Sequence, residues 1–498
     1  MVGVAGRSKA CLTCRRRRKG CDFQRPSCGQ CQRLGLRCDG YERPTTFVHT
    51  DPTTGAGSKT RESTVTKTKS NPPAKTITLP DSLVKSAYKA NCLGVFWDIY
   101  LPGYSDPAVS SARDGCISTV TWIIDIESLN MYSQNPFLER AVMAVCLGAL
   151  GRRQGDRGMI EESMKAYSAA VRGMSILLMN TNSARPPDDA MVATTRCLSL
   201  FEVFYSPDAS DKQNQALAWH RHRFGELALL SARTPEHQID GISHRMFADG
   251  RLSCTVASLA TRKGTILSRP EWKEIPWSQH KKTSIDLLLD IFVDVPGLLE
   301  SLDMVEAAYL ANLPNCRELK AKLLEQCTTA LQNLSSWFQH SAPSWDWNAH
   351  MNDTTPTTAD ITAAHNLCLF WAIELKVRGI VIDASLLPHK AADAAVKQQQ
   401  RRRYYTGLLQ QCEAIIQTAP IFFTPAAGIA GCQLAVFPLI LAHRVLTVVG
   451  SDVAREMQQD IRNLMARSED FDLAINSFVD SLWEVYRCHY CPGCQCKC

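Results

Sequence analysis

The sequence predicts a mostly α-helical protein with a small cysteine-rich domain at its start, a disordered linker and a large all-helical domain. Three observations support this fold class. Six of the 21 cysteines lie between Cys11 and Cys38, the next segment is rich in threonine and proline, and apolar residues then recur with helical spacing. With 498 residues, 45% of them hydrophobic, the chain can form a substantial core, which excludes a wholly disordered or fibrous protein.

Six cysteines near the start of the chain repeat with an internal shift of 17. The first three map onto the second three, in the order Cys11, Cys14, Cys21 and Cys28, Cys31, Cys38. Zinc prefers four tetrahedral ligands, and each half offers only three thiolates. Two zinc ions can share six sulfurs if two of them bridge, and the symmetry selects the first cysteine of each half, Cys11 and Cys28. Folding should then depend on metal, because so short a segment has no adequate core.

The cellular compartment decides between a metal site and disulfides. Met1 begins a stretch that contains basic residues and no apolar h-region, so no secretory signal peptide is expected. The most apolar stretch, Ile421–Ala442, contains Pro425 and Pro438 and lacks a stop-transfer flank, which favours a core helix over a membrane span. Thiols of an intracellular protein stay reduced, which favours a metal site. An unliganded segment and a disulfide knot are the alternatives.

Positive charge is concentrated in the same region. Residues 1–50 hold 11 of the 55 Lys and Arg but only 3 of the 49 Asp and Glu, which leaves the remainder slightly acidic. The run Arg15–Lys19 lies between two cysteines, and we expect it on a short helix after the first cysteine pair. Lysine and arginine neutralise phosphates, and arginine also binds guanine in the major groove. The run therefore indicates DNA binding, with a solvated basic run or a nuclear-import signal as the alternative.

The motifs of this segment occur together in one known family. They are Ala10-Cys11-Leu-Thr-Cys14-Arg-Arg-Arg-Arg-Lys-Gly-Cys21-Asp22, Pro26-x-Cys28-x2-Cys31 and Cys38-Asp-Gly-Tyr41. The segment resembles the DNA-binding domain of fungal binuclear zinc cluster transcription factors. The resemblance implies that a loop containing Pro26 joins the two halves and that CGG-type triplets are bound at the C-terminal end of the first helix.

The resemblance also suggests roles for individual cations. It places Arg18 at the base-contacting position with Arg17 beside it, and Arg15 at a phosphate-contacting position. Lys19 completes the set of candidate DNA-binding residues. Gly20 departs from the family, which usually has lysine or arginine before the third cysteine.

The domain boundaries follow from composition. We expect residues 8–42 to form the DNA-binding domain, 43–80 a flexible linker and 81–487 the helical domain. Eleven threonines lie between Thr45 and Thr78 with few large apolar residues, so this segment cannot bury enough surface to offset chain entropy.

Helical spacing covers most of the large domain. Asn135 and Pro136 form an N-cap pair, and Ser468 is a possible cap for a helix that continues to Val485. Further helices are predicted over roughly 187–205, 213–231, 284–312, 317–338, 358–380 and 395–417. More loosely, this domain resembles the helical regulatory domain that accompanies such clusters. Trp219 and His222 are part of that resemblance, and we interpret them as core and helix-contact residues.

Two further features lie outside these domains or motifs. The tail 488–498 holds five cysteines and His489, which would suit Cu(I) or Zn, with an unstructured tail as the alternative. The run Lys397–Arg403 is interpreted as a solvated helix face rather than an import signal.

The sequence as a whole predicts a sequence-specific transcription regulator of the nucleus that acts with RNA polymerase II and is not an enzyme. Its expected partners are double-stranded DNA and the transcription machinery or co-regulators, but no membrane. A homodimer and a monomer are both compatible with the sequence. Nucleophile elbows, zinc-binding histidine pairs and dinucleotide fingerprints are missing from the sequence. An enzyme with the cluster as locator and a zinc-dependent nuclear interaction protein without sequence-specific DNA recognition are the alternatives. Asp81–Leu101 lacks sustained apolar heptads, so no zipper is predicted.

Overall fold

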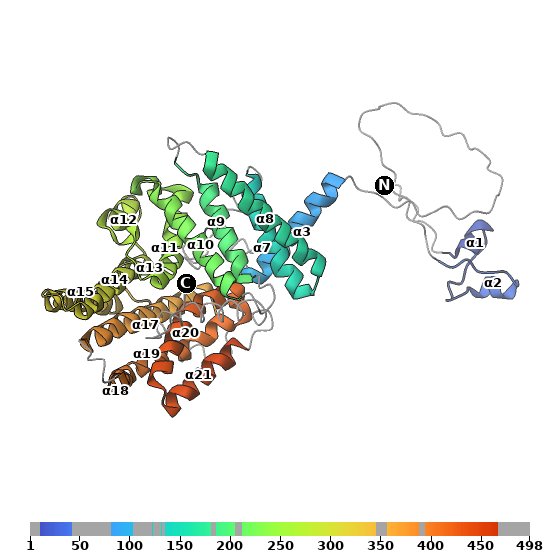
Figure 1. The fold of residues 1–498 in the computed structure, drawn as a ribbon. Helices are drawn as coiled ribbons and strands as arrows, with labels where there is room; N and C mark the ends of the chain where they lie inside the picture. Colours follow the sequence, from blue (N-terminus) through green and yellow to red (C-terminus); the bar gives the residue numbers. More distant parts are fainter. Residues whose placement is uncertain are drawn as a thin grey trace. The chain divides into compact units, whose positions relative to one another are not determined.

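The computed structural model describes residues 10–41, 81–102, 122, 131, 135–180, 186–204, 212–344, 356–387 and 394–466. The chain divides into two compact units, Met1–Ile77 and Thr78–Cys498. Within the described residues every regular element is a helix and none is a strand, which confirms the mostly α fold class (Figure 1). The predicted linker, the helix from Ser468 to Val485 and the cysteine-rich tail lie outside the described residues.

The N-terminal unit contains two five-residue helices, α1 (Leu12–Arg16) and α2 (Gly29–Arg33). Each begins after a cysteine whose sulfur accepts a hydrogen bond from the backbone N–H three residues later, at 3.3 Å in both helices. The expectation that Arg15–Lys19 all lie on a helix was wrong. Helix α1 ends at Arg16, because the chain turns and the N–H of Lys19 donates to the carbonyl of Cys14 at 3.0 Å.

The second unit begins with a group of long helices. They are α3 (Asp81–Tyr100), α7 (Pro136–Gln154), α8 (Arg157–Asn180), α9 (Asp189–Phe204) and α10 (Lys212–Ser231). The predicted cap of α7 is confirmed, since the Asn135 side chain accepts hydrogen bonds from the N–H groups of Phe137 and Leu138. Helices α7 and α8 approach closely because Gly173 leaves room for the ring of Phe137, which any Cβ there would overlap.

The middle of this unit contains helices of different lengths around α11. The elements are α11 (Gly241–Thr261), α12 (Pro270–Glu274), α13 (Ser284–Phe292), α14 (Val295–Leu310) and α15 (Cys316–His340), with 3-10 turns at Pro235–Gln238, Ile266–Ser268 and Ile275–Trp277. The single helix predicted over 284–312 is two helices, because Pro296 cannot donate a backbone hydrogen bond and starts a new first turn. Buried Arg251 joins α11 to α13 through Asp286 and Asp290, both at 2.7 Å.

The last elements surround one apolar helix. They are α17 (Thr358–Ser385), α18 (Ala394–Thr406), α19 (Leu409–Thr418), the 3-10 turns Ala419–Phe423 and Pro425–Ala427, α20 (Gly428–Val449) and α21 (Asp452–Met465). The single helix predicted over 395–417 is interrupted at Gly407 and Leu408, where the N–H groups bond back to Tyr404 and Tyr405 in a tighter turn.

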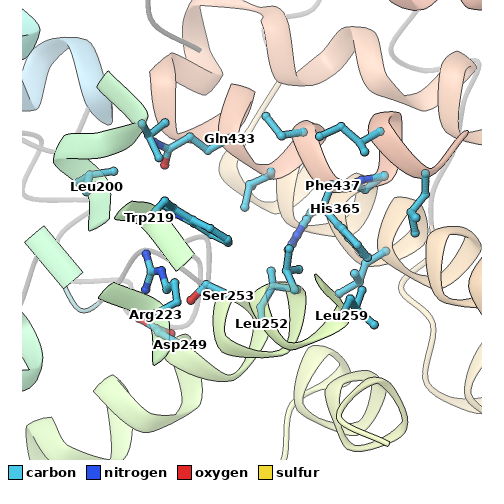
Figure 2. Close-up of a pocket in the computed structure, with 18 of the residues that line it drawn as sticks. Leu200, Trp219, Arg223, Asp249, Leu252, Ser253, Leu259, His365, Gln433 and Phe437 are labelled. Carbon is cyan, nitrogen blue, oxygen red and sulfur yellow. The ribbon is translucent and has the colours of Figure 1, made fainter. Parts of the chain in front are cut away.

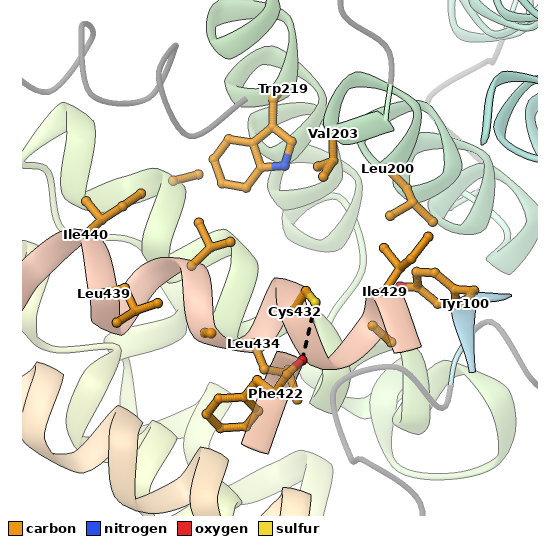
Figure 3. Packing of buried hydrophobic residues seen from close by; sticks show 14 of the residues in the cluster. Tyr100, Leu200, Val203, Trp219, Phe422, Ile429, Cys432, Leu434, Leu439 and Ile440 are labelled. Atoms are coloured by element: carbon orange, nitrogen blue, oxygen red, sulfur yellow. Dashed lines mark hydrogen bonds between the residues drawn. The ribbon is translucent and has the colours of Figure 1, made fainter. Parts of the chain in front are cut away.

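Helix α20 lies in the main core of the unit. Figure 3 shows Leu434, Leu439 and Ile440 of α20 among Trp219 and Leu200 from α10 and α9. Among the described helices, Pro425–Val449 alone is long and apolar enough to cross a membrane, with a mean hydropathy of 1.8. Of its most apolar window, 67% is buried inside the protein, as in the core helix predicted for this stretch.

Candidate metal centre and nucleic-acid interface

The sulfur atoms of the six N-terminal cysteines lie close together. Their sulfurs form two groups of four, each within 4.8 Å, composed of Cys11, Cys14, Cys21, Cys28 and of Cys11, Cys28, Cys31, Cys38. Cys11 and Cys28 belong to both groups, with their sulfurs 3.6 Å apart, and they are the pair that the sequence symmetry selects as bridging. Four sulfurs per group with two of them shared fit two zinc ions, each with a tetrahedral thiolate set.

The environment of the sulfurs explains why metal would be needed. Cys11, Cys14, Cys28 and Cys31 are buried, and burial raises the pKa of the Cys11 and Cys14 thiols and raises that of Cys31 to about 12. Zinc binds thiolates, so the two zinc ions must offset the free-energy cost of deprotonating these buried thiols.

The third cysteine of each half lies in a more polar setting. At Cys21, burial raises the pKa, but hydrogen bonds from the backbone of Cys11 and Phe23 outweigh it and lower the pKa to about 6. At Cys38, hydrogen bonds from the backbone of Cys28 and Gly40 lower the pKa in the same way. Cys28 and Gly40 follow Cys11 and Phe23 by 17 residues each. The same backbone hydrogen bonds to the third cysteine therefore recur in both halves.

Side chains outside the cysteines tie the two halves together. The Thr13 hydroxyl donates to the carbonyl of Arg37 at 3.1 Å and accepts from the N–H of Asp39 at 3.0 Å. Asp22 accepts from the N–H of Gly29 at 3.0 Å, and a Cβ at that glycine would overlap the same carboxylate. Our sequence prediction did not assign a role to Thr13 or Asp22, because only the folded cluster brings their side chains to these backbone partners.

The cations Arg15–Lys19 are all exposed. Arg15 and Arg16 lie in the last turn of α1, Arg17 caps it, and Arg18 and Lys19 follow in the turn. Arg16 forms an ion pair with Asp39. Within the described part of the chain the other four cations form no ion pair, so their charges are available to a polyanion. These four are the candidate DNA-binding residues Arg15, Arg17, Arg18 and Lys19.

Arg18 has an unusual backbone conformation. Its φ is +52°, and the residue that the shift of 17 relates to it, Gly35, has a φ of +60°. Their N–H groups make equivalent hydrogen bonds, to the carbonyls of Arg15 and Gln32 at 3.2 and 3.1 Å. A side chain in this left-handed conformation costs roughly 1–2 kcal/mol. The first half thus keeps a strained arginine where the second half has glycine.

The interpretation of Trp219 and His222 as core and helix-contact residues agrees with the structure. Trp219 is buried in the main core. The Nε2 atom of His222 lies 2.8 Å from the hydroxyl of Tyr167, which donates to Glu202. In the basic run of α18, Arg401 pairs with Asp383, whereas Arg402 and Arg403 are exposed.

Comparison with known proteins finds its most specific match in the first unit. Residues 9–46 match the family described as the fungal Zn(2)-Cys(6) binuclear cluster domain. The aspercryptin biosynthesis cluster-specific transcription regulator atnN of Emericella nidulans is 56% identical over 39 residues, which are 8% of this chain and 6% of that protein.

A second relative matches a longer stretch. An uncharacterized protein of Emericella nidulans is 27% identical over 194 residues, which are 36% of this chain and 39% of that protein. The matches thus span well under half of the length of these relatives, and no solved structure matches the chain. Taken with the sulfur geometry, the comparisons show that the chain carries a fungal Zn(2)-Cys(6) binuclear cluster domain at residues 9–46, together with a large helical domain.

Proposed function

We propose that the protein is a nuclear, sequence-specific DNA-binding regulator of transcription by RNA polymerase II that binds CGG-type sites. The observation that carries the proposal is the set of four exposed cations at the end of α1 and on the turn that follows it, next to six cysteines whose sulfurs lie close together. These four cations form no ion pair with the residues that the structure describes. The name of one relative, a cluster-specific transcription regulator, supports it.

In this proposal the six cysteines would hold two zinc ions, and Cys11 and Cys28 would belong to both sets of four ligands. Bound zinc would supply the positive charge that keeps six neighbouring sulfurs as thiolates. The chain itself orients the cations, because the Cys11 sulfur caps α1 and the Cys14 carbonyl accepts from Lys19, which ends it. The turn that presents Arg17 and Arg18 is therefore tied directly to two of the cysteines.

The cations would divide the work of binding. Arg15 would contact phosphate, which adds affinity without sequence preference, and Arg18 would contact a base with Arg17 beside it. Lys19 would contribute a further positive charge near the phosphate backbone of the DNA. The helical unit belongs to the slightly acidic remainder of the chain, so it has no net attraction for DNA, and we assign to it contacts with the transcription machinery or co-regulators.

The test is binding of the zinc-loaded full chain to a CGG-containing duplex and to a scrambled duplex of equal length and composition. We expect tighter binding to the CGG duplex, affinity that falls as salt rises, and loss of the preference after chelation. Equal affinity for both duplexes would favour the zinc-dependent interaction protein instead. Unchanged CGG preference after complete chelation would contradict the role of the cluster.

A further inference from the structure

The helical unit contains a cavity of about 180 Å³ that the proposed function does not use. It is larger than the roughly 150 Å³ engineered cavity that binds benzene. Figure 2 shows Trp219 of α10, Leu252 and Leu259 of α11, His365 of α17 and Phe437 of α20 around it. Helices from distant parts of the chain thus enclose a space large enough for one aromatic ring.

Most of the wall of this cavity is apolar. Its aliphatic and aromatic residues come from α9, α10, α11, α17 and α20, and they include Leu200, Trp219, Val256, Leu369, Phe437 and Leu441. A molecule that enters such a cavity gains free energy because its own apolar surface leaves water. The larger part of a ligand for this cavity is therefore apolar.

The charges of the wall compensate one another. Arg196 and Arg223 both donate to the carboxylate of Glu226, from Nε at 2.6 Å and from Nη1 at 2.8 Å. A second carboxylate, that of Asp249, lies in the wall itself. Two further cations of the wall have interaction partners within the chain, and they are Lys376 and Arg444. A charged ligand would lose its hydration without gaining an unpaired opposite charge, so the cavity favours a neutral ligand.

His365 of α17 is a polar group of the wall that needs a partner. Its side chain is buried, at 2% exposure, and its imidazole forms no hydrogen bond with the residues that the structure describes. Burial lowers the pKa of His365 to about 4, so the ring is neutral at pH 7 and offers one N–H donor and one nitrogen acceptor. Buried polar groups of folded proteins nearly always have a hydrogen-bond partner. The ring therefore indicates a partner supplied from the cavity.

The surroundings of His365 are apolar. Ile361 and Leu369, which lie about one turn before and after it on α17, are both buried. In Figure 2 the charged residues Arg223 and Asp249 lie apart from His365, at the other side of the cavity. A water molecule at the imidazole would need about two to four polar partners, and apolar side chains cannot act as such partners. A polar side chain on an otherwise apolar helix face departs from the packing pattern, as functional residues do.

We propose that this cavity binds a small, neutral, mainly apolar molecule with one hydroxyl group, and that His365 forms a hydrogen bond with that hydroxyl. A hydroxyl both donates and accepts, so it fits whichever ring nitrogen of His365 carries the proton. The apolar part is about the size of one aromatic ring and lies against Leu252, Leu259 and Phe437. The site is independent of the zinc cluster and goes beyond DNA binding.

The first test is calorimetric titration of the zinc-loaded full chain with phenol, para-cresol and benzyl alcohol, and with the hydrocarbons benzene and toluene. Benzoate and benzylammonium are charged probes of similar size. We expect saturable binding of at least one hydroxyl compound at one site per chain, and no saturable binding of either ion. If none of the hydroxyl compounds binds saturably, or if one of the ions binds as tightly as they do, the proposal is wrong.

The variant His365→Leu tests the hydrogen bond itself. It should bind benzene and toluene at least as well as the wild type does. It should bind the hydroxyl compound about tenfold more weakly, because the hydroxyl is then buried without a partner. His340→Leu at the exposed end of α15 is the matched control and should bind both kinds of compound as the wild type does. An equal loss of affinity for the hydroxyl compound and the hydrocarbon would overturn the role of His365.

The variant Ser253→Phe locates the binding. It places a ring in the cavity from α11 and should abolish binding, whereas Ser335→Phe on the exposed face of α15 should leave it unchanged. A retained melting temperature shows that each variant is folded, and if Ser253→Phe does not fold, His365→Leu decides. Wild-type binding of the hydroxyl compound by folded Ser253→Phe would overturn the assignment to this cavity, whatever the affinity for the CGG duplex.

Discussion

The two halves of the cysteine cluster have the same backbone arrangement but different surfaces. Each begins with a capping cysteine, forms a five-residue helix, and then turns so that an N–H donates to the carbonyl of its second cysteine, from Lys19 in one half and Leu36 in the other. Where the first half exposes Arg17 and Lys19, the second exposes Leu34 and Leu36. A duplicated metal scaffold therefore carries the proposed DNA-binding charges on one half only.

The glycines show the same difference. Gly35 and Gly40 have positive φ in the second half, and the first half has Arg18 and Phe23 in the equivalent conformation. The backbone thus needs these turns in both halves, but only the first keeps side chains there at a cost. Strain retained at a surface position points to a function for the side chain.

The largest effect is expected when a sulfur that belongs to both groups of four is removed. Cys11→Ser removes a sulfur that belongs to both groups of four, so the variant should lose both zinc ions and all CGG preference. Cys38→Ser affects one group only and should retain one ion more tightly than the other. Zinc content by native mass spectrometry distinguishes the two, and equal retention in both variants would contradict shared ligation.

The next effect concerns the strained arginine. Arg18→Gly gives the first half the glycine of the second, so zinc content should stay at two while discrimination between CGG and scrambled DNA falls by about 1–3 kcal/mol. Gly35→Arg is the reciprocal change and should not improve discrimination. If Arg18→Gly weakens binding to both duplexes equally, Arg18 is a phosphate contact.

A smaller effect is expected at Arg15, which the shift of 17 relates to Gln32. Arg15→Gln should reduce affinity for all sequences and lower the slope of log affinity against log salt by about 0.9, the value for one phosphate contact. The slope is measured from binding isotherms at several salt concentrations. An unchanged slope would mean that Arg15 contacts no phosphate.

The smallest effect is expected at Arg16 and its counterpart Arg33. Arg16 pairs with Asp39 at the surface, and exposed ion pairs contribute about 0–1 kcal/mol. Arg16→Ala and Arg33→Ala should therefore leave zinc content and CGG preference nearly as they are. Loss of CGG preference in Arg16→Ala would show that its charge serves DNA rather than Asp39.

Ligand spacing made the metal centre predictable. Each half has three cysteines, and zinc needs four ligands, so the sharing of one pair related by the repeat was predictable. The folded cluster shows that pair to be Cys11 and Cys28. The end of α1 was not predictable in this way, because a run of arginines and lysine suits a helix and the bond from Lys19 to Cys14 that ends it belongs to the folded cluster. The strained backbone of Arg18 was not predictable either, because it too belongs to the turn that forms in the folded cluster.

The helical unit was predicted where apolar spacing and caps coincide, as at Asn135 and Pro136. Residues 232–283 were not assigned, because α12 and the 3-10 turns are too short to show periodicity. The longer helix α11 buries polar residues such as Asp249 and Arg251, which interrupts its apolar spacing. Helix α21 was missed although Ser451 caps it, since its polar face dominates the composition.

The central claim is that one half of a duplicated scaffold binds DNA. The most direct measurement combines Arg15→Gln, Arg17→Leu, Arg18→Gly and Lys19→Leu, which gives the first half the surface residues of the second. Zinc content and affinity for the CGG duplex are measured on the same full-length sample. We expect two zinc ions per chain and no preference for CGG over scrambled DNA, whereas retained preference would contradict the claim.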